Sequence, residues 1–439
     1  MMHRKPNEGE MLRYIILDDD PTGIQTVHGC YVLTDWNDDV IRTALGDSVP
    51  FFYILTNTRA CGRTEARKRV AEAVRTVTRL HANTNERLVF ISRSDSTLRS
   101  HFPLELDTIC SEAIPDPDAR IFVPAFFEGG RITDSDTHYV LEGETRIRAD
   151  QTEFARDSVF GYRTSYLPGY ITEKTKGGVQ EADIASLTID ELRGDSETDL
   201  IHRLMDLSGG NYLIVNAVRY DDLDVFARAC GSAMRAGKSF VFHGAASIVK
   251  SLTETDSRPL VRPTSESVRR GIVVAGSHVQ KTTRQLERLF ELPLTEKIEL
   301  DVHGILDDAA SVCGWCVEQI ERALADGRIP VVYTSRTEAA FGTTAERLEA
   351  GARISDALVS IVRQIRSPLD FLVSKGGITS HEILTRGLGV RMARVEGQAE
   401  PGVPVIRIDS HDGMLYVIFP GNVGSDATLT EVVAAMSGL

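Results

Sequence analysis

The chain carries Tyr14-Ile15-Ile16-Leu17-Asp18-Asp19-Asp20-Pro21-Thr22-Gly23 near its start. Four apolar residues bounded by turn residues are typical of a buried strand in a parallel sheet, and such sheets present their sites at the carboxyl ends of strands. Pro21 and Gly23 favour a tight turn. Three carboxylates therefore crowd one strand end, where their repulsion indicates that a cation, a base or a substrate hydroxyl shares the site. A solvated acidic loop or a helix cap is the alternative interpretation.

Composition limits both the class of protein and its partners. The 439 residues exceed the usual size of one hydrophobic core, so two domains are expected. The net charge of −14 and the lack of a long basic run argue against a nucleic-acid partner. No apolar stretch approaches eighteen residues, so no membrane partner is expected. The six cysteines are scattered and the first ten residues lack an apolar core, which favours a reduced, cytoplasmic compartment.

Strands and helices alternate along the first half, which is typical of a mostly parallel sheet covered on both faces. A stretch at 132–181 is loop-rich, polar and aromatic, and is expected to carry a hairpin or a lid. The strands are expected at 14–17, 30–33, 51–55, 88–91, 120–123, 212–215 and 240–242, and the helices at 38–45, 65–81, 102–114 and 223–236.

Polar residues and two prolines without periodicity mark a linker near 254–268. We therefore predict two domains, at 1–255 and 269–439, joined by a linker at 256–268. The predicted fold class is α/β, with two domains that are each a mostly parallel sheet flanked by helices, and with the active site in the cleft between them. In the second half, strands are expected at 271–275, 330–333, 371–373 and 415–419, and helices at 280–290, 305–324 and 345–365.

The strand ends of the first half carry acidic and basic side chains. If the sheet is parallel, these loops converge on one edge and bring together Asp19, Asp20, Asp95, Arg99 and Arg131. Arginines can grip a carboxylate in a bidentate manner, and aspartates accept hydrogen bonds from hydroxyls. The set therefore suits a small hydroxylated acid. Ion pairs that only hold the loops together are the alternative.

Three glycine turns follow strands of the second half, at 276–277, 376–379 and 421–424. Free amide groups at a helix start attract phosphate, and small residues let it approach closely. Lys375 adds a positive charge beside the second turn. Neither of the last two turns fits the P-loop or the dinucleotide fingerprint, and Gly-Ser turns also occur for steric reasons. Three such turns in one half nevertheless favour a nucleotide.

Cys313 and Cys316 have the spacing of a redox or zinc half-site. They fall where apolar residues recur at helical spacing, and no second cysteine or histidine pair accompanies them. We therefore interpret them as helix packing residues.

In this order, these stretches resemble the four-carbon acid sugar kinases, an ATP-dependent family with a sugar-acid-binding N-terminal domain and an ATP-binding C-terminal domain. The resemblance covers nearly the whole chain. The family patterns Asp-Asp-Leu-Thr-Gly and Asp-Ser-Thr-Leu-Arg-Gly match residues 19–23 and 95–100. Its Gly-Gly-Asp-Thr and Lys-Ser-Gly-Asn-Phe-Gly turns are similar to residues 376–379 and 419–424.

The resemblance implies a kinase that phosphorylates a hydroxyl of a four-carbon sugar acid such as a threonate, an erythronate or a 3-oxo-tetronate. It implies ATP and Mg²⁺ as cofactors, with the metal ligands unknown, and the sequence leaves open whether copies of the chain form a homo-oligomer. The implied site comprises catalytic Asp19 and Asp20, substrate-binding Asp95, Ser96, Arg99 and Arg131, and nucleotide-binding Ser277, Lys375, Gly376, Gly377, Ile378, Thr379, Gly421 and Asn422.

The sequence departs from the family where Ile378 replaces an acidic residue and Phe419 replaces a lysine. Loss of these groups would alter the handling of phosphate or metal, and it leaves a non-catalytic nucleotide or sugar-acid sensor as an alternative. A second alternative is a haloacid dehalogenase-like phosphatase, because Asp18, Asp20 and Thr22 resemble its nucleophile loop. That reading leaves the second half of the chain unexplained.

Overall fold

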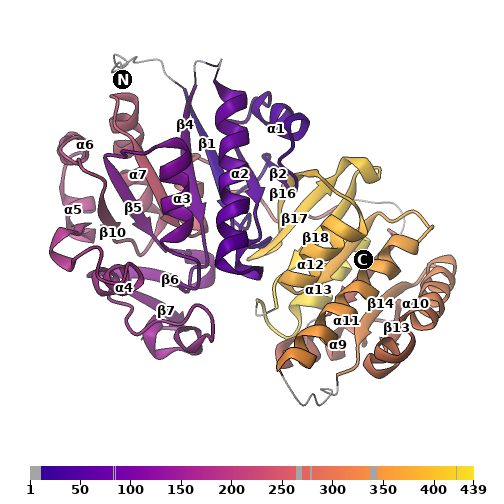
Figure 1. The fold of residues 1–439 in the computed structure, drawn as a ribbon. Helices are drawn as coiled ribbons and strands as arrows, with labels where there is room; N and C mark the ends of the chain where they lie inside the picture. Colours follow the sequence, from indigo (N-terminus) through magenta and orange to yellow (C-terminus); the bar gives the residue numbers. More distant parts are fainter. Residues whose placement is uncertain are drawn as a thin grey trace. The chain divides into compact units, whose positions relative to one another are not determined.

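The computed structural model describes residues 11–82, 84, 86–263, 269–276, 279–336, 344–421 and 423–439. The chain forms two compact units, Met1–Ser257 and Arg258–Leu439. Each unit is an α/β structure built on a sheet with helices packed against it, as Figure 1 shows. The predicted fold class of two α/β domains with mostly parallel sheets is therefore confirmed.

The sheet of the first unit is parallel at every strand pair between its described strands. Its strands lie in the order β2 (Tyr31–Leu33), β3 (Phe51–Leu55), β1 (Leu12–Asp18), β4 (Arg87–Arg93), β11 (Phe240–Gly244), β5 (Ala119–Val123), β10 (Asn211–Val215) and β9 (Ala185–Leu187). Every residue of β1 is buried, which explains why the strand reads as a continuous apolar run rather than an alternating one.

Helices connect these strands and cover the sheet. Figure 1 shows α2 and α3 lying over the same face, where they pack against each other, and α7 packs on α6 and α8. The helices of the unit are α1 (Asp38–Leu45), α2 (Arg63–His81), α3 (Leu104–Ala113), α4 (Leu167–Lys174), α5 (Ile189–Gly194), α6 (Glu197–Met205), α7 (Tyr220–Arg235) and α8 (Ala246–Leu252).

The loop-rich stretch expected to carry a hairpin or a lid forms a small antiparallel sheet followed by α4. The sheet is a meander of β6 (Arg131–Asp134), β7 (Thr137–Glu142) and β8 (Thr145–Arg148). Its first strand begins at Arg131, so this small sheet fixes the backbone of a predicted substrate-binding residue.

The second unit combines parallel and antiparallel pairing. Its strands lie in the order β13 (Thr295–Leu300), β14 (Ile329–Thr334), β12 (Gly271–Ala275), β15 (Phe371–Lys375), β18 (Met414–Phe419), β17 (Val403–Ile408) and β16 (Met392–Glu400). The first five strands in this order pair in parallel, and β17 and β16 continue the sheet in antiparallel register. No strand was predicted from the sequence at the positions of β13, β16 or β17.

The helices of the second unit pack in pairs, with α10 on α11 and α9 on α13. They are α9 (Gln280–Leu289), α10 (Val302–Ala325), α11 (Thr344–Gln364), α12 (Gly377–Glu382) and α13 (Thr428–Ser437). The core of the unit includes Leu286 of α9, Phe371 of β15, Phe419 of β18 and Val432 of α13, all of which are buried. Cys313 and Cys316 lie buried on α10 as free thiols, in agreement with a packing role.

Gly271 at the start of β12 tests this packing. A Cβ atom at this position would lie 2.3 Å from the ring of Phe371, so we expect the Gly271→Ala variant to be destabilised by about 1–3 kcal/mol through overpacking. The matched control is Gly314→Ala on α10, where a Cβ atom meets nothing within 4 Å. That change should stabilise the protein by about 0.5–1 kcal/mol because alanine is the better helix former. Urea denaturation measures both, and an unaffected Gly271→Ala protein would contradict the packing.

Candidate substrate and nucleotide sites

The loops after β1, β3 and β4 are tied together at the carboxyl edge of the first sheet. The amide of Asp19 donates to the carbonyl of Arg93 over 3.2 Å, and the amide of Arg59 donates to the carbonyl of Asp19 over 3.3 Å. Gly23 closes the first loop against the strand end, because a Cβ atom there would lie 2.1 Å from Asp18 Oδ2. The parallel register therefore gathers the polar strand ends at one edge.

Arg93 is buried and lies beneath this cluster. Its Nη1 donates to Asp18 Oδ1 over 2.9 Å and to Asp19 Oδ1 over 3.4 Å. Burial raises the pKa of Asp18 to about 7 and that of Asp19 to about 6, although the charge of Arg93 opposes both shifts. Asp18 Oδ2 and Asp19 Oδ2 are buried without a hydrogen-bond partner. Asp19 therefore has one unpaired carboxylate oxygen of raised basicity.

Asp18 is 0% exposed, and its carboxylate lies directly behind Gly23. The nucleophile of a phosphatase has to reach the phosphorus of its substrate in line. Arg93 occupies Asp18 Oδ1 and the backbone of Gly23 lies against Oδ2, so neither oxygen has a clear approach and the geometry gives no support to the phosphatase alternative.

Arg59 joins two further carboxylates, and the sequence reasoning did not assign it to the site. Its guanidinium forms ion pairs with Asp20 and with Asp95, the second over 3.3 Å. Burial acts to raise the pKa of Asp20, but Arg59 and the hydrogen bonds from Thr22 outweigh it and hold that pKa below its usual value. Asp95 likewise has a pKa well below its usual range, because Arg59 and Arg99 outweigh burial. Asp20 and Asp95 are therefore ionised, and both oxygens of each carboxylate already have a partner.

The three remaining predicted substrate-binding residues differ in how they are engaged. Arg99 donates from Nε to Asp95 Oδ2 over 2.8 Å and lies over the ring of Phe154 at 4.8 Å. Ser96 is buried, and its carbonyl accepts a hydrogen bond from His138 over 2.7 Å. Arg131 donates to its own loop at the carbonyl of Gly129, and its Nε is buried without a partner.

Arg131 therefore stands apart from the other arginines of the cluster. Among the described residues it has no carboxylate within ion-pair distance, whereas Arg59, Arg93 and Arg99 each have two. Burial lowers its pKa from the usual value, and the charge of Asp95 offsets only part of that shift. Its guanidinium is left with capacity to bind an added carboxylate.

Glu105 on α3 lies beneath the cluster and was also missed from the sequence. Its carboxyl group accepts hydrogen bonds from the hydroxyls of Thr58 and Ser92, and Ser92 Oγ lies 3.1 Å from His243 Nδ1. Burial, together with the charge of Asp19, raises the pKa of Glu105 to about 8. At neutral pH the group is therefore mostly protonated, which limits the negative charge below the loops.

In the second unit, the three glycine turns adjoin one another at the carboxyl edge of β12, β15 and β18. The amide of Gly376 donates to the carbonyl of Phe419 over 2.8 Å. A Cβ atom at Gly276 would lie 2.6 Å from Thr379 Oγ1, so the first two turns touch. Gln285 on α9 holds the third turn by donating to the carbonyls of Val423 and Ser425.

The predicted nucleotide-binding residues fall on these turns where the structure describes them. Gly376 adopts a φ of 113°, which favours glycine, and Gly377 begins α12. Ile378 is 69% exposed, an unusual state for a large apolar side chain. The carbonyl of Gly421 accepts a hydrogen bond from the ammonium of Lys375. The other two predicted residues, Ser277 and Asn422, lie outside the described residues.

Within the described residues of the two units, no group of three or more His, Cys, Asp or Glu side chains is placed to hold a metal ion. No described helix combines the length and the apolar character needed to cross a bilayer.

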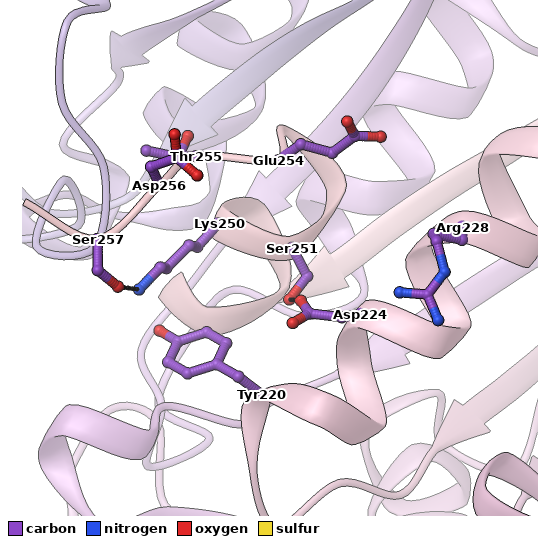
Figure 2. A pocket seen from close by; sticks show the side chains of 9 residues that line it. All are labelled: Tyr220, Asp224, Arg228, Lys250, Ser251, Glu254, Thr255, Asp256 and Ser257. Atoms are coloured by element: carbon purple, nitrogen blue, oxygen red, sulfur yellow. Dashed lines mark hydrogen bonds between the residues drawn. The ribbon is translucent and has the colours of Figure 1, made fainter.

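A separate cavity of about 480 Å³ lies in the first unit between α7, α8 and the chain that follows α8 (Figure 2). Lys250 reaches across it to Ser257 over 2.9 Å and lies over the ring of Tyr220 at 4.4 Å. The hydroxyl of Tyr220 donates to Glu128, in the loop that precedes Arg131. The lining carries both signs of charge, with Arg228 and Lys250 beside Asp224, Glu254 and Asp256, and so defines no single ligand chemistry.

Comparison with known proteins assigns a class to each unit. A family model described as a sugar-binding N-terminal domain matches residues 14–252, and one described as a nucleotide-binding C-terminal domain matches residues 272–429. Together these two models describe a protein with one sugar-binding and one nucleotide-binding domain. The chain belongs to the family built from these two domains, which is the architecture of the four-carbon acid sugar kinases.

Individual relatives are distant. The D-erythronate kinase of Heliobacterium modesticaldum (strain ATCC 51547 / Ice1) is 26% identical over 375 residues, which cover 82% of this chain and 78% of that protein. The crystal structure of Haemophilus influenzae protein HI1011 has a TM-score of 0.67 at 16% identity, covering 95% of this chain and 98% of its own. A structure from Salmonella typhimurium LT2 has a TM-score of 0.71, also at 16% identity, over 96% and 98% of the two chains. These structures share the fold.

The raised pKa of Asp18 predicts a pH-dependent stability. The folded state keeps this proton up to a pH near the raised pKa of about 7, whereas an unperturbed aspartate has a pKa of 3.8, so folding takes up a proton between these limits. The free energy of unfolding contributed by Asp18 therefore falls as the pH rises through that window. The Asp18→Asn variant lacks this titration. We therefore expect its free energy of unfolding, relative to that of the unmodified protein, to be about 2 kcal/mol higher at pH 8 than at pH 5.

Urea denaturation at the two pH values measures this difference. Asp116→Asn, at an exposed residue of the same unit, is the matched control and should show no such gain. An equal effect of both substitutions at the two pH values would contradict the buried, proton-retaining state of Asp18.

Proposed function

We propose that the protein is an ATP-dependent kinase that phosphorylates a hydroxyl of a four-carbon sugar acid of the threonate, erythronate or 3-oxo-tetronate type. The observation that carries the proposal is the pairing, on one chain, of a sugar-binding domain with a nucleotide-binding domain. The relative named D-erythronate kinase shares this layout over most of its length and supports the same substrate class.

Arg131 is the proposed anchor of the substrate carboxylate. Its guanidinium lacks a carboxylate partner among the described residues, whereas Arg99, which we first expected to share this role, is already bound to Asp95. Pairing between a guanidinium and a carboxylate is bidentate and charge-assisted, so it fixes orientation as well as affinity. Arg99 and Ser96 are then assigned to shaping the loop around the acid, with Asp95 as an acceptor for its hydroxyls.

Asp19 is the proposed general base, ahead of Asp20. A base must hold an unpaired oxygen and a pKa near the working pH, and Asp19 has both. Asp20 has a lowered pKa and is engaged by Arg59 and Thr22, so it is assigned to positioning. In the reaction, Asp19 Oδ2 takes the proton of the attacking hydroxyl, the new O–P bond forms to the γ-phosphorus, and the bond to the β-phosphate oxygen breaks to release ADP.

The adjoining glycine turns are the proposed nucleotide contacts, through Gly376 to Thr379, Gly421 and, outside the described residues, Ser277 and Asn422. Backbone amides on such turns bind phosphate oxygens without a charged side chain. Mg²⁺ is proposed as the companion of ATP. Because the described residues form no metal cluster, the ion would be held chiefly by the phosphates themselves, as Mg²⁺ commonly is.

The direct test is ADP release from ATP and Mg²⁺ across a panel of D- and L-threonate, both erythronates and the corresponding 3-oxo acids. Turnover with one acid, far above the turnover with its matched sugar alcohol, would support the proposed function and identify the substrate. ATP binding without turnover on any acid would refute it in favour of the sensor alternative. Release of phosphate from phosphorylated acids without ATP would refute it in favour of a phosphatase.

Removal of the proposed general base, Asp19, should slow the chemical step. We expect the Asp19→Asn variant to lose about 10²–10⁴-fold in kcat with its preferred acid, because the hydroxyl proton has no acceptor. In the unmodified protein, kcat/KM should rise with pH through about 6, where Asp19 loses its proton, and the variant should lose this limb of the profile. If Asp19→Asn retains full turnover while Asp20→Asn does not, the role of base belongs to Asp20.

Removal of the carboxylate anchor should change specificity more than chemistry. We expect the Arg131→Met variant to lose about 100-fold in kcat/KM for the acid, since a charge-assisted hydrogen-bonded pair contributes about 1.5–3 kcal/mol. Its weak activity with the matched sugar alcohol should be unchanged. Arg146→Met, on the same small sheet at β8, is the matched control and should behave as the unmodified protein. Retained preference for the acid in Arg131→Met would exclude Arg131 as the anchor.

A further inference from the structure

Lys375 ends strand β15 with a side chain that is 0% exposed. Its Nζ donates to the carbonyl of Pro420 over 2.5 Å and to the carbonyl of Gly421 over 3.2 Å, and it lies 4.0 Å from the ring centroid of Phe419. The amine therefore connects the strand end before the second glycine turn to the backbone of the third. It sits beneath the proposed phosphate contacts rather than on their surface.

This amine lacks a counter-ion among the described residues, where no carboxylate lies within ion-pair distance of it. Its partners are the ring of Phe419, which ends β18, and the carbonyls of Pro420 and Gly421, which follow that strand. Lys281 on α9, a group of the same charge, also acts on it electrostatically. Burial, with a smaller contribution from Lys281, lowers the pKa of Lys375 to about 7. The free protein therefore holds this amine about half protonated at neutral pH.

A buried ammonium without a counter-ion is costly, and its neutral form is favoured until an anion arrives. The turns that Lys375 connects are the proposed contacts of the nucleotide phosphates. A phosphate bound on those turns would supply the missing negative charge from a few ångströms away. We propose that Lys375 is a positioning residue whose amine takes up a proton from solvent when a nucleotide binds, so that nucleotide affinity is coupled to pH.

This inference rests on the proposed nucleotide site and adds a measurable property to it. If binding restores the pKa of Lys375 to its usual value of about 10, proton uptake at this group should be about 0.1 at pH 6 and about 0.9 at pH 8. Binding that takes up protons weakens as the pH rises. The contribution of Lys375 should therefore lower the affinity for ADP about tenfold between pH 6 and pH 8.

Isothermal titration of ADP into the full chain, in buffers of different ionisation enthalpy, measures the uptake directly. The phosphates of ADP also titrate, so the comparison is made against Lys375→Arg, which keeps a permanent charge, and Lys375→Met, which keeps the apolar stem. Both variants share the contribution of the ligand and lack that of Lys375. Lys297→Met is the matched control, because Lys297 is exposed on the edge strand β13 and lies 4.6 Å from the ring centroid of Phe290.

We expect the unmodified protein and Lys297→Met to take up about 0.9 proton more than either Lys375 variant at pH 8, and about 0.1 more at pH 6. Lys375→Met should also bind ADP at least about tenfold more weakly at pH 6. A purely structural role of Lys375 would change affinity without changing proton uptake. Equal uptake by the unmodified protein and either folded variant overturns this inference alone, whereas failure of the unmodified protein to bind ADP overturns the proposed nucleotide site as well.

Discussion

The ion pair between Arg93 and two aspartates is the constraint on which the substrate side of the protein depends. Three consecutive carboxylates end a fully buried strand, and their repulsion would open the loop if no cation lay beneath it. Arg93 comes from the adjacent parallel strand at the paired register position, where it faces Asp18. The sheet itself therefore supplies the charge that lets the acidic loop exist.

The cluster then separates its carboxylates by environment. Burial leaves Asp19 basic and partly unpaired, while Arg59 keeps Asp20 and Asp95 ionised. Groups of one residue type thus acquire different capacities, which is how a site can hold a base and positioning groups side by side. The second unit shows the converse case, in which Lys375 is buried and no carboxylate of the described residues lies within ion-pair distance of it, which is the basis for its proposed response to an anion.

Strongly apolar or periodic segments could be predicted from the sequence. The strands at Phe51–Leu55 and Gly271–Ala275 and the helix at Asp38–Leu45 have the predicted bounds. Strand β13 was missed because its residues are largely polar and only two are buried. Strand β16 was missed although its burial alternates regularly, because three of its four buried residues, Ala393, Gly397 and Ala399, are too small to give a strong apolar signal.

Some residues of the candidate site could likewise be predicted from the sequence, and others could not. Asp19 and Asp95 were placed together because the carboxyl ends of parallel strands share an edge. Arg59 was overlooked because one arginine in a polar loop carries no sign of which carboxylates it will reach. Glu105 was overlooked because an acidic residue in the first turn of a helix is usually solvated and favoured by the helix dipole. Only tertiary packing reveals that it is buried and protonated.

The proposed reaction transfers a phosphoryl group from ATP to a hydroxyl of a four-carbon sugar acid. It can be followed by ³¹P nuclear magnetic resonance of the protein with ATP, Mg²⁺ and each acid of the panel. We expect the γ-phosphate signal to be replaced by one phosphomonoester signal, coupled to a carbon-bound proton of the acid, in step with the formation of ADP. Conversion of ATP to inorganic phosphate alone, or persistence of ATP with every acid, would contradict it.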